Sequence, residues 1–370
     1  MLRGDVVKKL RIAVLGATGS IGRQTLTVFD RNREFFSLSL IANDKDLEGL
    51  KQLERKYCPE NVYNYSTATD KNYLADPATY ADIDLVVNGI AGLSGLRPSE
   101  AVIRAGKILA TANKESIVCY GEHLKALAKT TEASIRPVDS EHSAMWQCLE
   151  DYDNVKSLII TASGGAFRDL SLDEIARATG KDALKHPNWN MGRKVTVDCA
   201  TMVNKGLEII EAKRLFDIRD VVPVMHRESI VHSMVEMKDG TVKASLSTPN
   251  MELPIQYAMT YPERLSTPYD SLDLVKLGRL SFEPIDREKY PALAVAEAIS
   301  DKDEFYSTVF VSADELLVEK YLEGKISYFD VAKYLQSAID NIPYRIIKGI
   351  DDIFIIDALT KAYLSEAIGE

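Results

Sequence analysis

Apolar runs alternate with amphipathic segments through the first 137 residues. The segment LRIAVLG at 10–16 is almost wholly apolar, which is typical of a strand buried on both faces of a sheet. Apolar residues at helical spacing then predict a helix from Ser20 to about Asn32. Further strands are predicted at 37–42, 83–89, 107–112 and 134–139, and a second helix at 47–57. Strands that alternate with helices require crossover connections, so this part predicts an α/β fold with an N-terminal Rossmann-like parallel sheet.

The pattern changes after Val138. A strand near 155–162, a helix at 201–216 and two strands joined by the Asp-Gly turn of MKDGTV predict a central α+β domain with a mixed sheet over 138–263. Prolines and polar residues at 264–290 indicate a linker. Amphipathic stretches such as VAKYLQSAIDNI and DALTKAYLSEAI predict a C-terminal α-helical domain over 291–370.

Composition narrows the class of protein. A chain of 370 residues with 46% hydrophobic residues can build more than one core. Its 45 basic and 55 acidic residues give a net charge of −10, which argues against nucleic acid as a partner. The four cysteines are scattered and form no CxxC pair, which predicts a cytoplasmic protein. The apolar runs are too short for a membrane helix, which predicts that the protein does not bind membranes.

Three glycines follow the first strand and open the first helix. The segment GATGSIG at 16–22 places Gly16, Gly19 and Gly22 where a tight turn brings the backbone close to a pyrophosphate at a helix N-terminus. The first domain, 1–137, is therefore predicted to bind a dinucleotide. Asp44 and Lys45 follow the second strand and point to different cofactors, since an acidic residue there favours NAD and a basic one favours NADP.

Candidate metal and anion ligands lie further along the chain. Asp139 and Glu141 follow a predicted strand at the sheet edge where ligands bind, and their oxygens suit Mg²⁺ or Mn²⁺. Two carboxylates are too few, and the same residues could simply cap a helix. Asn204, Lys205 and Glu208 share a helical segment, in which the lysine and the neighbouring amide could bind phosphate or belong to a solvated helix face. Ser163 precedes two glycines, which could also bind phosphate or form an ordinary turn.

The polar segment HPNWNMGRK at 186–194, here called the lid segment, contains His186, Trp189 and Met191. Exposed tryptophan and methionine in such a loop are typical of a lid that closes over a ligand, although a histidine before proline can also be an ordinary loop residue. Asn113, Lys114 and Glu115 follow another predicted strand.

Six segments in this order closely resemble the 1-deoxy-D-xylulose 5-phosphate reductoisomerase family: GATGSIG, ANKES, DSEHSA, SGGAFR, HPNWNMG and NKGLE. The resemblance extends from about residue 10 to the end. It implies an NADPH-dependent rearrangement and reduction of this sugar phosphate to 2-C-methyl-D-erythritol 4-phosphate, in non-mevalonate isoprenoid synthesis. It also implies a divalent metal, Mg²⁺ or Mn²⁺, and a cytoplasmic homodimer. The C–C bond shift could follow a retro-aldol/aldol or a direct ketol route.

The resemblance also assigns roles to individual residues. It makes Asp139, Glu141 and Glu208 the metal ligands, which gives the domain 138–263 the catalytic and metal-binding role. Contacts with the hydroxyl and carbonyl end of the substrate are implied for Lys114, Ser140 and His186, and contacts with its phosphate for Ser163, Asn204 and Lys205. Trp189 and Met191 are implied to lie on the lid. The cofactor site is implied to be lined by Thr18, Gly19, Ser20, Ile21, Asn113, Glu115 and Gly192, with Asn43 and Lys45 near its ribose end.

Several positions depart from the family pattern. Cys199 stands where a phosphate-binding serine is usual, and a thiol is the weaker donor. Asn43-Asp44 replaces a more neutral turn, which leaves the cofactor preference open. Arg227 and Asp314 replace proline and asparagine at places without an assigned role. Two other functions stay open: an NAD(P)-dependent semialdehyde or sugar-phosphate dehydrogenase, for which Cys199 would be the nucleophile, and a non-catalytic dinucleotide sensor.

Overall fold

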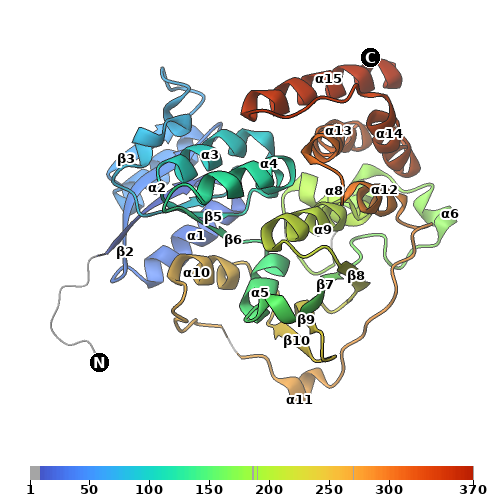
Figure 1. Ribbon diagram of the computed structural model, residues 1–370, viewed down its shortest axis with the longest axis horizontal. Helices are drawn as coiled ribbons and strands as arrows, with labels where there is room; N and C mark the ends of the chain where they lie inside the picture. Colours follow the sequence, from blue (N-terminus) through green and yellow to red (C-terminus); the bar gives the residue numbers. More distant parts are fainter. Residues whose placement is uncertain (1–8, 186, 190, 270, 370) are drawn as a thin grey trace. The chain divides into compact units, whose positions relative to one another are not determined.

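The computed structural model of the protein describes residues 9–185, 187–189, 191–269 and 271–369 (Figure 1). The chain divides into two compact units. The first contains residues 9–116, 123–139 and 250–268, and the second contains 117–122, 140–249 and 269 onward. These units differ from the predicted domains, because 250–268 belong to the first unit and the helices after 290 belong to the same unit as the central sheet. The separate roles assigned to the four predicted segments stay a prediction.

The first unit is built on a six-stranded parallel sheet in the order β3-β2-β1-β4-β5-β6. The strands are β1 (Leu10–Leu15), β2 (Phe36–Asn43), β3 (Asn61–Asn64), β4 (Leu85–Asn88), β5 (Ile108–Thr111) and β6 (Ser134–Pro137). Five of them lie where the apolar pattern predicts strands. The short β3 was not predicted, because its first two residues are exposed and its sequence, NVYN, contains a single aliphatic residue.

Helices surround this sheet: α1 (Ser20–Arg31), α2 (Leu47–Tyr57), α3 (Leu96–Arg104), α4 (Lys114–Ala128), α10 (Glu252–Thr260) and the short turns Tyr73–Ala75, Pro77–Tyr80 and Gly92–Gly95. Helix α10 packs against α1, and Ile255 and Met259 join the core around Val14. The sequence pattern gave no helix here, because Pro254 interrupts it. The proline is tolerated because it lies in the first turn, where its missing N–H has no intrahelical acceptor.

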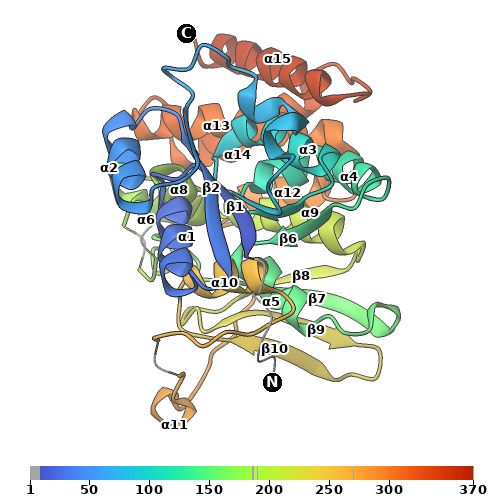
Figure 2. The same ribbon diagram turned by 90° about the vertical axis from the view of Figure 1, so that its left-hand side faces the viewer.

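The second unit contains a mixed four-stranded sheet in the order β10-β9-β7-β8. Strands β7 (Val155–Ala162) and β8 (Val221–Met225) are parallel, whereas β9 (Val231–Met237) runs antiparallel to β7 and to β10 (Val242–Leu246). The predicted Asp-Gly turn joins β9 to β10. Helix α5 (Ser140–Cys148) covers one face of the sheet and contacts β9 and β10 (Figure 2).

The remaining helices of this unit are α6 (Leu172–Ile175), α7 (Gly180–Ala183), α8 (Arg193–Thr201), α9 (Val203–Phe216), α11 (Leu274–Leu277), α12 (Pro291–Ile299), α13 (Glu304–Leu322), α14 (Tyr328–Asn341) and α15 (Ile350–Ile368), with a short turn at Tyr152–Asn154. The predicted C-terminal helices are confirmed. The predicted helix at 201–216 instead begins at Val203, because Met202 takes a left-handed conformation with φ 63° and separates α8 from α9. In the described part of the chain, no helix has the length and apolar character needed to cross a membrane.

Candidate functional site

Packing explains the spacing of the glycines after β1. Gly16 has φ +74°, and a Cβ atom there would lie 2.6 Å from the carbonyl oxygen of Gly89. A Cβ atom on Gly22 would lie 2.3 Å from the carbonyl oxygen of Gly16. Helix α1 follows Gly19, which has no side chain to cap it, and its first turn contains no acidic residue. Its first N–H groups therefore suit an anion such as a pyrophosphate.

The end of β2 lies beside this turn. Asn43 is buried, and its Nδ2 donates to Thr18 Oγ1 at 3.2 Å and to the carbonyl oxygen of Asp46 at 2.6 Å. The carboxylate of Asp44 accepts a hydrogen bond from Ser66 Oγ at 2.6 Å, whereas the side chain of Lys45 is exposed. Asn43 thus orders the loop, and Lys45 offers a cation to an anionic group at this edge.

Asn113 and Glu115 order a second loop of the first unit. Asn113 begins α4, where its Oδ1 accepts from the N–H of Ser116 at 3.1 Å. Its Nδ2 donates to the carbonyl oxygens of Ile90 and Gly92, both at 2.8 Å, and to Glu115 Oε2 at 3.0 Å. These contacts give both side chains a structural role beside the cofactor role that the resemblance implies. The other implied cofactor residue, Gly192, lies in the second unit and directly precedes α8.

Three carboxylates form a candidate metal site at the start of α5 and on α9. Asp139 directly precedes α5, Glu141 lies on α5, and Glu208 lies on α9. Each offers an oxygen, and the three oxygens all lie within 4.8 Å of one another. Lys114 Nζ lies 3.1 Å from Asp139 Oδ2. The structure brings the two carboxylates of the DSE segment close to Glu208, and their role as metal ligands stays a prediction.

Lys205 and Asn204 both contact these carboxylates. Lys205 is buried, and its Nζ lies 3.0 Å from Glu141 Oε1 and also contacts Glu208. Asn204 donates to Glu208, and the Ser140 hydroxyl donates to Glu141. The donor set fits Mg²⁺ or Mn²⁺, which prefer anionic oxygen ligands, and two oxygens bound to one Mg²⁺ lie about 3–4 Å apart. Lys205 therefore competes with such an ion for these carboxylates.

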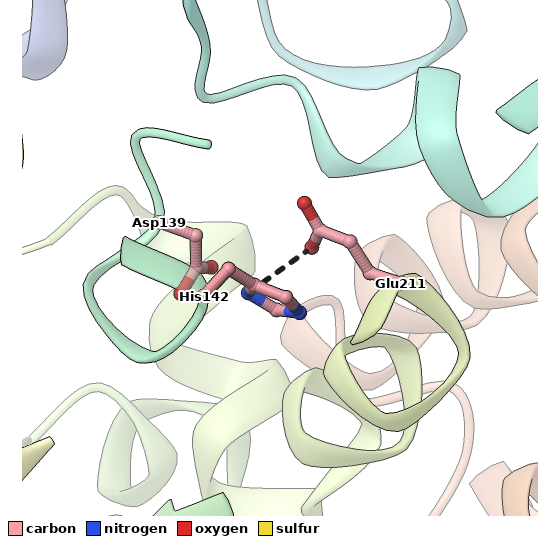
Figure 3. A group of neighbouring side chains, drawn as sticks. All are labelled: Asp139, His142 and Glu211. Atoms are coloured by element: carbon pink, nitrogen blue, oxygen red, sulfur yellow. Dashed lines mark ion pairs between the residues drawn. The ribbon is translucent and has the colours of Figure 1, made fainter. Parts of the chain in front are cut away.

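A buried histidine contacts the backbone of Glu208, one of the three carboxylate residues (Figure 3). His142 follows Glu141 on α5, and its Nε2 lies 3.0 Å from the carbonyl oxygen of Glu208 on α9. Its Nδ1 faces Glu211 Oε2 at 3.7 Å, and Figure 3 shows the two side chains directed toward each other with Asp139 beside them. Since a carbonyl only accepts, Nε2 carries a proton. His142 therefore ties α5 to α9 at the backbone of a predicted metal ligand.

Sequence reasoning missed His142 and Glu211. The available signal was their spacing, since His142 directly follows Glu141 and Glu211 lies three residues, about one helical turn, after Glu208. Both side chains are almost fully buried.

Ser163 lies in a loop that abuts α8. The following residues, Gly164 and Gly165, have φ +85° and +62°, and a Cβ atom on Gly165 would lie 2.4 Å from the carbonyl oxygen of Cys199. The glycines therefore allow this loop to contact the end of α8 closely. Cys199 is half-buried there and forms no disulfide. The structure thus brings the Ser163 loop and the Cys199 backbone together, while Asn204 and Lys205 are directed at the carboxylates.

Among the described residues of the lid segment, Trp189 is docked against the sheet of the second unit. His186 lies outside the described residues. The ring of Trp189 is half-buried and meets the ring of His232 on β9 edge-on, with centroids 6.3 Å apart. The expectation of an exposed tryptophan is therefore wrong, because the sheet of the second unit supplies an aromatic partner. Met191 is also half-buried.

The two unassigned departures form ion pairs. Asp314 on α13 is fully buried and pairs with Lys194 in the first turn of α8, which also contacts Asp198 at 2.7 Å. Burial raises the pKa of Asp314, and the Lys194 ammonium opposes that rise. Arg227 pairs with Asp169 and, at 3.0 Å, with Glu283. Both residues therefore have structural partners.

Models of three related sequence families match the chain. The 1-deoxy-D-xylulose 5-phosphate reductoisomerase model matches residues 12–77 and 62–121, its C-terminal domain model matches 135–216, and the DXP reductoisomerase C-terminal domain model matches 246–363. The 1-deoxy-D-xylulose 5-phosphate reductoisomerase of Listeria innocua is 40% identical over 374 residues, covering 96% of this chain and 98% of its own. The chain belongs to the 1-deoxy-D-xylulose 5-phosphate reductoisomerase family.

Further reductoisomerases agree with this assignment. That of Heliobacterium modesticaldum is 39% identical over 97% of this chain and 98% of its own. A DOX-P reductoisomerase crystallised with NADPH, fosmidomycin and magnesium superposes with a TM-score of 0.91 at 32% identity, over 97% of this chain and 98% of its own. The Zymomonas mobilis enzyme in complex with NADPH gives a TM-score of 0.88 at 32% identity, over 98% of this chain and 100% of its own. The predicted fold class and family are thereby confirmed.

Proposed function

We propose that this reductoisomerase family member converts 1-deoxy-D-xylulose 5-phosphate to 2-C-methyl-D-erythritol 4-phosphate with NADPH and Mg²⁺ or Mn²⁺, in isoprenoid precursor synthesis. The observation that carries the proposal is the meeting of Asp139, Glu141 and Glu208, in a chain of this family. A simple dehydrogenase or a dinucleotide sensor would leave three such carboxylates without a function. Family membership therefore favours the rearranging enzyme.

The roles of the residues follow from their chemistry. A bound divalent cation would supply Lewis acidity at the substrate oxygens, and a bound NADPH would supply the hydride. Asp139, Glu141 and Glu208 hold the cation, while Lys114 and Ser140 lie beside them and orient the substrate's oxygens. His186 is proposed to act at the same end.

The substrate phosphate is assigned to a second group of residues, Ser163, Cys199, Asn204 and Lys205. Phosphate binding away from the reacting carbons supplies orientation, and closure of Trp189 and Met191 over the substrate excludes water. The glycine turn with Thr18, Gly19, Ser20 and Ile21 is assigned to the cofactor's pyrophosphate.

An assay of NADPH oxidation with 1-deoxy-D-xylulose 5-phosphate tests the function. We expect oxidation that requires Mg²⁺ or Mn²⁺ and a branched product, identified by NMR. Oxidation that persists after exhaustive chelation, or that yields an unbranched alcohol, would contradict the proposal and favour the simple dehydrogenase.

Cofactor preference is expected to depend on Lys45. Because Ser66 donates to the Asp44 carboxylate and Lys45 is exposed, we expect a higher kcat/KM with NADPH than with NADH. Lys45→Gln should lower the NADPH-to-NADH ratio of kcat/KM by about 10–100-fold, since a charge-assisted hydrogen bond contributes about 1.5–3 kcal/mol. Lys51→Gln, on the exposed side of α2, is the matched control. A wild-type preference for NADH would show that Asp44 governs the ribose end.

Cys199→Ser tests the phosphate assignment. A hydroxyl is a better donor than a thiol, and a neutral hydrogen bond contributes about 0.5–1.5 kcal/mol, so the KM for substrate should fall about two- to tenfold while kcat is retained. Cys58→Ser, at an exposed position, should change neither constant. Collapse of kcat would instead identify Cys199 as the nucleophile of a semialdehyde dehydrogenase.

We also propose that two copies pair through the mixed sheet. The residues Val222, Ile159, Met234 and Ala244 form one row across β8, β7, β9 and β10, on the face opposite the core that α5 joins. Val222 is 45% exposed, although a valine in a sheet is usually covered. Sedimentation velocity should therefore report about twice the chain mass of 41.2 kDa.

The four cysteines form no disulfides, which supports the proposal of a cytoplasmic location.

A further inference from the structure

One backbone carbonyl receives hydrogen bonds from two parts of the proposed site. The carbonyl oxygen of Arg227, between β8 and β9, accepts from Arg168 Nη1 at 3.1 Å and from Asn188 Nδ2 at 2.8 Å. Arg168 ends the SGGAFR segment that contains Ser163, and Asn188 precedes Trp189 in the lid segment. We propose that this carbonyl couples the phosphate loop to the lid, which makes Arg168 and Asn188 positioning residues. The proposal rests on the proposed function, because that function assigns the phosphate to Ser163.

Arg168 orients Ser163 through the backbone. Its Nη1 also donates to the carbonyl oxygen of Ser163 at 3.2 Å. A Cβ atom on Gly164 would lie 2.7 Å from the Cβ of Arg168, so the arginine packs directly against the phosphate loop. Its side chain is 18% exposed. A planar guanidinium can bridge two carbonyls in a fixed geometry, which the single ammonium of a lysine does not reproduce.

Asn188 docks the lid segment on the same carbonyl. Its Nδ2 also lies 2.8 Å from Ser229 Oγ, so both amide hydrogens have acceptors. The orientation of the amide follows from chemistry, since the Arg227 carbonyl requires a donor. The next residue, Trp189, meets His232 on β9. Asn188 and Trp189 therefore rest on the β8–β9 loop and on the strand that follows it.

The loop that presents the Arg227 carbonyl is held by several hydrogen bonds. His226 is fully buried, and its Nε2 accepts from the N–H groups of Ile230 and Val231 at 3.1 and 3.0 Å. Its Nδ1 therefore carries the proton and donates to the carbonyl oxygen of Ser281 at 2.8 Å. Ser229 is held at φ +54°, which is uncommon for a non-glycine residue and persists only where the surroundings impose it.

The two donors share the lone pairs of one carbonyl oxygen. A displacement of the Ser163 loop that moves the Arg168 guanidinium therefore changes the lone pair and the space that are open to the Asn188 amide. Phosphate binding at Ser163 thereby favours one position of the lid segment. The two donors should act on substrate binding as a unit and should not affect cofactor binding.

A double-mutant cycle with Asn188→Asp and Arg168→Met tests the proposal. Aspartate has the shape of asparagine but presents an acceptor to the carbonyl. We expect each single variant to raise the KM for 1-deoxy-D-xylulose 5-phosphate about five- to tenfold and to leave the KM for NADPH unchanged. The double variant should raise the substrate KM by clearly less than the product of the two factors. Arg104→Met, which removes an exposed arginine of α3, controls for loss of an arginine and should change neither constant.

Multiplicative effects in the double variant, or a KM for substrate within twofold of wild type in Asn188→Asp, would overturn the coupling. If a variant lowers the melting temperature strongly, Ser229→Ala, which removes one acceptor only, replaces it and should raise the substrate KM by a smaller factor.

A second readout separates this proposal from the proposed function. In a Trp146→Phe background, Trp189 is the remaining tryptophan, and Asn188→Asp should increase acrylamide quenching of its fluorescence without any substrate present. Unchanged quenching would show that Asn188 does not dock the lid segment, whichever substrate the enzyme takes. Increased quenching in a protein without reductoisomerase activity would retain the docking contact and reject the proposed function alone.

Discussion

Glu208→Gln is expected to lower turnover at least about a hundredfold while the protein stays folded and binds NADPH. An amide oxygen carries no charge, and even partners outside the ligand shell cost about 10–100-fold when they are removed from a metal site. Glu208 is 1% exposed and contacts both Lys205 and Asn204, so no water can take its place without rearrangement. The measurements are kcat/KM with saturating Mg²⁺ and the Kd of Mn²⁺ by calorimetry.

Glu319→Gln is the matched control for this variant. Glu319 lies on α13 with its side chain exposed, so the same chemical change there should alter neither constant. Thermal unfolding of both variants confirms that they are folded. Full activity in Glu208→Gln would remove Glu208 from the metal site and leave two carboxylates, which are too few to hold the ion.

The fold of the first unit was predictable because its strands are buried on both faces. Predominantly apolar runs such as 10–16 and 37–42 need no tertiary information to be recognised. By contrast, β3 has a single aliphatic residue, and α10 has an early proline. Their positions are decided by tertiary packing, since Ile255 of α10 joins a core whose members outside 251–259 lie more than a hundred residues earlier.

The candidate site was predictable where a side chain itself carries the chemistry. Asp139, Glu141 and Glu208 are recognisable by type and spacing once the resemblance is seen, and the structure brings their oxygens together. The Arg227 carbonyl was not predictable, because any residue presents the same backbone oxygen and only the loop geometry selects it. The docking of Trp189 on His232 likewise depends on a strand more than forty residues later.

Lys205→Met is expected to change metal and substrate binding in opposite directions. Lys205 is 4% exposed, and its ammonium pairs with both Glu141 and Glu208, so it competes with a divalent cation for these carboxylates. The family resemblance assigns the same lysine to the substrate phosphate. A cation at the carboxylates would repel the ammonium, so we expect Lys205 to leave the carboxylates when they bind the cation and then to pair with the phosphate.

Two measurements on the variant follow from this exchange. Without Lys205, two neighbouring carboxylates lose their counter-charge, and the Kd of Mn²⁺ for the substrate-free enzyme should fall about tenfold. The Kd of a phosphonate substrate analogue should rise about 10–100-fold, because a charge-assisted hydrogen bond worth about 1.5–3 kcal/mol is lost. Lys213→Met is the matched control, since Lys213 lies on the same helix and pairs with Asp301 at 2.9 Å. If Lys205→Met weakens the binding of both Mn²⁺ and the phosphonate, the lysine supports the site's structure and does not exchange between the two anionic groups. If Mn²⁺ binding tightens and phosphonate binding is unchanged, the phosphate is held by Ser163 and its neighbours without this ammonium.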